Sequence, residues 1–156
     1  MATRCLIRLH ELNNVIKIYR HSDGYPEGVL SDLLAFKEIY PDFNAKLRGI
    51  EYWVSNFIFY IKLAKLLSYK DKFKLEDVDA PWILGYGILS NDEECEKHVD
   101  YVYDLYFTES EVRVRIYHCI DKKVIFEGSL EDAVKKFNVR KNGCQLKLNV
   151  IKNFFK

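Results

Sequence analysis

Two short stretches of alternating apolar and polar residues near the N-terminus constrain the fold of this chain more than any other feature. Residues 5–9 and 15–19 each carry apolar side chains at every second position, the period of a half-buried β-strand. Asn13 and Asn14 lie between them, and asparagine tolerates the positive φ angles of a tight two-residue turn. The two stretches therefore predict a β-hairpin. One face carries Cys5, Ile7, Leu9, Ile16 and Ile18, and the other carries Arg4, Arg8, His10, Lys17, Tyr19, His21 and Asp23.

The remaining residues predict further strands and three helices. Pro26 and Glu27 suit the first turn of a helix that continues from Val29 to Tyr40, and Gly24 permits a sharp turn before it. Further helices are predicted at 49–69 and 130–137, the latter capped by Ser129, and further strands at 82–89, 101–107, 111–120, 123–127 and 144–150. The pattern predicts a single α+β domain over 1–156, a mostly antiparallel sheet of about five to six strands with two or three helices packed on one face.

Composition indicates a soluble protein of the cytoplasm. The formal net charge of +1 predicts no general attraction to nucleic acid or membrane. The four cysteines form no short pair, which fits a reducing compartment. The longest apolar region, 50–67, contains Glu51, Lys62 and Lys65, too many charges for a comfortable membrane span.

The predicted 49–69 helix is apolar nearly all round, apart from a narrow polar stripe. Such a helix is either buried centrally or shared with a partner. The sequence thus leaves open whether 49–69 forms the core or the interface of a homodimer.

The hairpin and residues 21–28, the junction between it and the next predicted helix, bring charged side chains to that helix's N-terminus. The predicted turn places Arg4 opposite Asp23, His21 opposite Leu6, and Arg8 opposite Tyr19. Arginines beside helix N–H groups suit a phosphate. The predicted ligand-binding residues are Arg4, Arg8, Tyr19, His21, Asp23 and Tyr25.

Two alternatives remain for the same residues. His21 and Asp23 could hold a divalent metal or act as a base and its orienter. In a purely structural interpretation, Asp23 caps the turn and pairs with Arg4, and His21 is a solvated strand end. His118 lies on the apolar face of its predicted strand and is predicted to be a hydrogen-bonded core histidine. His98 is predicted to lie in a solvated acidic turn.

Charge is distributed unevenly along the chain. Residues 76–111 hold eleven acidic residues and one basic residue, whereas 135–156 hold seven basic residues and no acidic one. The basic C-terminal segment, with Phe154 and Phe155, could bind nucleic acid through phosphate contacts and base stacking. Internal pairing with the acidic stretch is the favoured interpretation, because the overall charge is nearly balanced.

Residues 2–4, the hairpin and the run Ile18-Tyr-Arg-His-Ser-Asp-Gly-Tyr-Pro-Glu-Gly-Val29 resemble a family of small uncharacterised phage and prokaryotic proteins. Members begin with a Thr/Ser-Arg strand and carry an H-W-D-G-Y-P-E-G-V junction, in which Ser22 replaces the tryptophan here. Residues 99–103 resemble their central aromatic strand. The resemblance covers roughly the first thirty residues and implies a viral or mobile-element setting in a host cytoplasm.

These observations support three hypotheses. The leading one is a virus- or mobile-element-type binding protein that engages a host protein or a nucleotide-like, phosphate-bearing ligand, and could thereby counter host defence. The second is a metal-dependent hydrolase or nuclease that uses His21 and Asp23. The third is a homodimeric structural protein. No common nucleotide-loop or hydrolase motif is present, so the sequence does not decide whether the chain is an enzyme. Only the hydrolase would need a cofactor, its metal.

Overall fold

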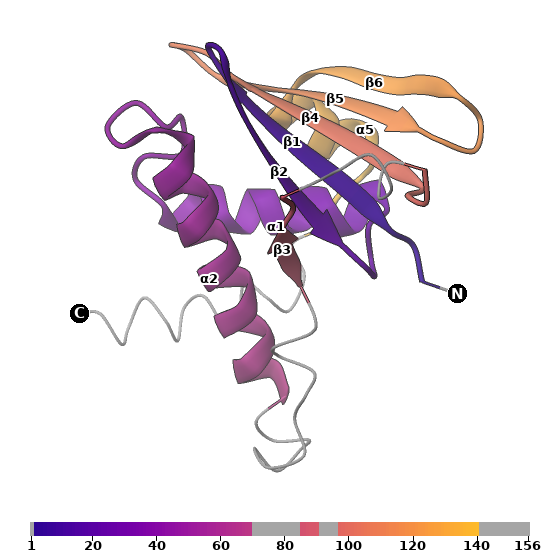
Figure 1. Ribbon diagram of the computed structural model, residues 1–156, viewed down its shortest axis with the longest axis horizontal. Helices are drawn as coiled ribbons and strands as arrows, with labels where there is room; N and C mark the ends of the chain where they lie inside the picture. The colour runs from indigo at the N-terminus through magenta and orange to yellow at the C-terminus, as the bar shows by residue number, and fades with distance from the viewer. Residues whose placement is uncertain (1, 70–84, 91–96, 141–156) are drawn as a thin grey trace.

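The computed structural model describes residues 2–69, 85–90 and 97–140, which form a six-stranded sheet with three helices on one face (Figure 1). The strand order is β3-β2-β1-β4-β5-β6, and the strands are β1 (Cys5–Glu11), β2 (Asn14–Arg20), β3 (Tyr86–Ile88), β4 (Tyr101–Phe107), β5 (Val112–His118) and β6 (Lys123–Ser129). Neighbouring strands are antiparallel except β1 and β4, which pair in parallel at the centre. The predicted α+β class is confirmed.

The hairpin forms as predicted, but its register differs from the predicted one by two residues. Cys5 pairs with Arg20 and Arg8 with Lys17, and the turn consists of Leu12, with φ 50°, and Asn13. Asn14 belongs instead to β2, where its side chain donates to Glu51 Oε1 at 2.7 Å. A two-residue shift leaves every side chain on its predicted face. It does, however, remove the predicted oppositions of Arg8 to Tyr19 and of His21 to Leu6.

Helix α1 (Pro26–Ile39) begins where the sequence predicts, with Pro26 in its first turn. Gly24 has an ordinary φ angle, so the predicted sharp turn belongs to Asp23, whose φ is 58°. Gly24 is needed for a different reason. A Cβ atom there would lie 2.9 Å from the Arg4 carbonyl carbon and from Cys5, because the junction runs against the start of β1.

Helix α2 (Gly49–Tyr69) is buried centrally, one of its two predicted positions. Trp53 and Phe57 are fully buried and pack against Phe36 of α1, and Trp53 also contacts Phe107 of β4 edge to face. Phe59, which the sequence places among the apolar residues outside the polar stripe, is 62% exposed. The homodimer stays a prediction.

The C-terminal part of the described chain follows the predicted order. Helix α5 (Leu130–Lys136) is capped by Ser129, whose Oγ accepts from Asp132 N at 3.1 Å. The predicted strand at 144–150, residues 82–84 of another, and seven of the eleven acidic and four of the seven basic residues of the two charged segments lie outside the described residues. None of the described helices is both long and apolar enough to cross a membrane.

A buried polar triad links β2, α1 and β3. Arg20 points into the core from β2 and is ion-paired with Asp32 of α1. Tyr86 of β3 accepts from Arg20 Nη1 at 2.8 Å and donates to Asp32 Oδ2 at 3.0 Å. The three side chains thus bind one another in an otherwise apolar core, with Arg20 Nε lacking a partner among the described residues, which makes each side chain costly to remove by itself.

Candidate functional site

A pocket of about 370 Å³ lies where the start of β1, the start of β4, the end of β5 and the start of α1 meet. We call it the Arg4 pocket. Its lining residues are Ala2, Thr3, Arg4, Tyr25, His98, Asp100, Tyr101, His118 and Ile120. Its volume is at the small end of the range for small-molecule sites. Two of the six predicted site residues, Arg4 and Tyr25, lie in it.

Backbone contacts fix Arg4 at this position. Asp100 Oδ2 accepts from Arg4 N at 2.8 Å, and Asp100 N donates to Arg4 O at 2.9 Å. On the other side, Gly24 N donates to Thr3 O at 2.9 Å, and Tyr103 Oη donates to Gly24 O at 2.7 Å. The junction and the start of β4 therefore flank the Arg4 backbone.

The Arg4 side chain has an unsatisfied donor in the described part of the chain. Its Nε atom is buried there without a hydrogen-bond partner. A buried donor without a partner costs about 1–3 kcal/mol, more when it carries charge. An anion bound at the guanidinium would offset that cost.

His118 lines the same pocket and is held in a fixed orientation. Its ring stacks on Tyr101 at 4.7 Å, and its Nδ1 lies 2.9 Å from Asp121 Oδ2. A carboxylate only accepts, so Nδ1 carries the proton and Nε2 is the acceptor of the neutral ring. The hydrogen bond from His118 lowers the pKa of the Asp121 carboxyl. The predicted hydrogen bond exists, but His118 is half-buried at the end of its strand instead of in the core.

The pocket carries charges of both signs. Burial, with the negative charges of Glu27, Asp100 and Asp121, raises the pKa of the Tyr101 hydroxyl. Tyr101 is therefore a phenol at neutral pH, able to donate a hydrogen bond. A ligand here meets a cation at Arg4 and acceptors at the β4 side.

The remaining predicted residues lie apart from this pocket. Tyr19 Oη is 3.1 Å from His21 Nδ1, and Asp23 faces Arg20 at 3.8 Å instead of Arg4. Across the described ranges, no group of three or more His, Cys, Asp or Glu side chains is arranged to hold a metal ion. His21 and Asp23 as metal ligands stay a prediction.

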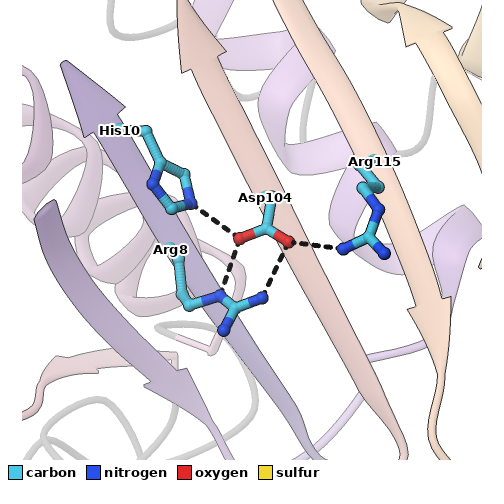
Figure 2. Close-up of polar contacts among 4 residues, drawn as sticks. All are labelled: Arg8, His10, Asp104 and Arg115. Atoms are coloured by element: carbon cyan, nitrogen blue, oxygen red, sulfur yellow. Dashed lines mark hydrogen bonds and ion pairs between the residues drawn. The ribbon is translucent and has the colours of Figure 1, made fainter. Parts of the chain in front are cut away.

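Arg8 belongs to a second polar cluster, on the sheet face opposite the helices (Figure 2). Arg8 binds Asp104 of β4 through two hydrogen bonds, Nε to Oδ1 at 2.6 Å and Nη2 to Oδ2 at 2.8 Å. His10 Nε2 lies 2.7 Å from Oδ1, and Arg115 of β5 donates to Oδ2 at 3.4 Å. Burial acts to raise the pKa of Asp104, but the bonds from Arg8 and His10 outweigh it, and the pKa lies below its usual value.

Sequence reasoning missed both groupings for one reason. The parallel pairing of β1 with β4 puts Asp104 opposite Arg8, and the same pairing brings Asp100 to Arg4. No local sequence pattern indicates that two strands so far apart in the chain are neighbours in the sheet. The alternation within 101–107 does show which side chains share a face, but not which strand they meet.

Comparison of the chain with protein-family models, with curated proteins and with solved structures finds no match. The resemblance of the first thirty residues to phage and prokaryotic proteins therefore stays a prediction, and so does the viral setting that it implies.

Proposed function

We propose that this chain is a binding protein that holds a nucleotide-like, phosphate-bearing ligand in the Arg4 pocket. One observation carries the proposal: a single pocket contains both Arg4, with its unsatisfied buried Nε, and an aromatic wall formed by Tyr25 and Tyr101. The ligand would thus be recognised by charge at one end and by ring contacts at the other.

The phosphate belongs at Arg4. A guanidinium binds phosphate oxygens through two parallel hydrogen bonds. The Asp100 carboxylate repels a phosphate placed next to it. It suits instead an N–H or O–H donor, such as a ribose hydroxyl or a base amino group.

The base belongs against the tyrosines. Tyr25 is exposed at the start of α1, and Tyr101 is ordered by stacking on His118. Stacking of a base on an aromatic side chain contributes about 1–3 kcal/mol and depends little on which base it is. This wall accordingly favours a nucleotide over free phosphate.

Calorimetric titration with a nucleoside monophosphate, the matching nucleoside and inorganic phosphate tests the proposal. We expect the monophosphate to bind most tightly. Arg4→Gln should weaken it about 10- to 150-fold, because a hydrogen bond to a charged group is worth about 1.5–3 kcal/mol. Tyr25→Ala should weaken the monophosphate and nucleoside alike. Arg48→Gln and Tyr52→Ala, at exposed positions around the start of α2, are the matched controls.

Two results would contradict the proposal. One is the absence of binding by any of the three compounds to a folded protein. The other is binding that Arg4→Gln and Arg48→Gln weaken equally, since that would place the ligand elsewhere. Amide spectra of each variant establish that the fold is intact.

A further inference from the structure

The sheet face opposite the helices has two unlike halves. At the end nearer the Arg4 pocket it is apolar, with Leu6, Val99 and Val102 buried in a small separate cluster. At the other end it is polar. This polar half consists of Arg8, His10, Asp104, Tyr106, Arg113 and Arg115, from the neighbouring strands β1, β4 and β5. All three described helices pack on the other face (Figure 1).

Guanidinium groups outnumber carboxylates among the six residues of the polar half. Its one carboxylate, Asp104, is 1% exposed and is covered by its partners, and Glu127 of the neighbouring strand β6 lies opposite Arg115 in the β5–β6 register. Arg8 and His10 bind it closely, whereas Arg115 makes a single contact at 3.4 Å and is 34% exposed (Figure 2). Arg113 is 47% exposed and pairs with Glu111 at the strand's start. The outward-facing ends of this half are therefore mainly guanidinium groups.

An ordered aromatic pair lies among these cations. The rings of His10 and Tyr106 stack at 4.6 Å with an interplanar angle of 16°, and Tyr106 is 39% exposed. The Asp104 bond holds His10, so Tyr106 rests on a fixed surface. Tyr106 is also directly opposite Arg113 in the β4–β5 register. One aromatic face and two arginines thus lie within about one or two strand spacings of 4.7–4.9 Å.

We propose that the polar half of this face binds single-stranded nucleic acid, with a base against Tyr106 and phosphates at Arg113 and Arg115. Aromatic platforms interleaved with cations on a sheet are how proteins hold unpaired strands, because every base has a ring face and every nucleotide a charge. A sheet face offers no projecting element to enter a duplex groove, which favours single strands over double strands. This site is independent of the Arg4 pocket.

Fluorescence anisotropy with a labelled oligouridylate or oligothymidylate of about 20 nucleotides tests the proposal. Tyr106→Leu should weaken binding about 5- to 150-fold, the loss expected for one stacked base. Arg115→Gln should reduce the slope of log affinity against log salt by about 0.7, the value for one phosphate contact to a single strand. Arg115 contributes only one long contact to Asp104, so this variant should keep its fold. Arg48→Gln, an arginine on the helix-covered side, should behave as wild type.

Three results would overturn the assignment. Failure of the folded wild-type protein to bind either oligonucleotide at low salt is the first. Binding that neither Tyr106→Leu nor Arg115→Gln changes would place the strand elsewhere, for example on the basic C-terminal segment. Equal affinity for a duplex of the same length would show attraction to charge without base stacking.

Discussion

Removal of Arg20 alone should destabilise the protein strongly, because it leaves the Asp32 carboxylate buried without its cation. Arg20 and Asp32 are both buried and ion-paired, and Tyr86 bonds to each of them. Breaking a buried pair by removing one partner costs about 3–5 kcal/mol. For Arg20→Met we expect a loss of that size. In a chain of this length it corresponds to a fall in melting temperature of roughly 6–20 °C.

Replacing both charges should cost much less than the sum of the two single losses. In Arg20→Met/Asp32→Leu no charge of the triad is left buried. The remaining cost is the orphaned Tyr86 hydroxyl, about 1–3 kcal/mol. A double-mutant cycle should therefore give a coupling energy of several kcal/mol. Asp23→Asn is the matched control. Asp23 also faces Arg20, but at 3.8 Å from an exposed position, so its loss should cost less than about 1 kcal/mol.

Urea unfolding followed by tryptophan fluorescence measures these differences. With a slope of about 2 kcal/mol per molar urea, the single variants should unfold about 1.5–2.5 M earlier than wild type. Costs below about 1 kcal/mol for Arg20→Met, or additive losses in the double variant, would refute the view that the triad acts as one unit.

Three further predictions concern other parts of the fold. Gly24→Ala should lose about 1–3 kcal/mol in a thermal-shift assay because its Cβ would meet the backbone ahead of β1, whereas Gly87→Ala, with open space, should not. The lowered pKa of Asp104 gives stability that is present above the unfolded value near 3.9 and lost as pH falls through the folded pKa, so the urea midpoints of wild type and Asp104→Asn should converge in acid. Burial raises the pKa of the Cys5 thiol to about 12, so mass mapping should find Cys5 unalkylated at pH 8 until urea is added. Divergence of those midpoints in acid, or alkylation of Cys5 in the native protein, would contradict the respective prediction.

Local sequence patterns were sufficient to predict most elements of the described fold. The alternation at 5–9 and 15–19 and the β-branched and aromatic residues at 101–107 and 111–120 each correspond to a strand in the structure. The helix at 49–69 has its predicted bounds because a long apolar surface needs the core that it fills. These patterns depend on residues that are close together in the chain, and a single sequence is enough to recognise them.

Contacts between distant segments could not be predicted in the same way. The hairpin turn includes Leu12, an apolar residue with a positive φ, because Asn14 and Glu11 are engaged by the start of α2. The predicted site residues lie in two separate groups for a similar reason. Arg4 and Arg8 are neighbours on one strand, but β4 presents Asp100 to the first and Asp104 to the second. A single sequence carries no signal for such partners.

The central position of β1 has a consequence for how the chain folds during synthesis. β1 and β2 emerge early, whereas β4 follows about 90 residues later, a delay of roughly 5–20 s at ordinary elongation rates. Until then the inner edge of β1 is unpaired and open to other strands. Once β4 is made, a slip of one residue between β1 and β4 would place Tyr103 or Leu105 beside Arg8 and His10 in the position of Asp104. The ion pairs of Asp104 therefore form only in the correct parallel register. A misaligned pairing of β1 with β4 would lack them and would be less stable.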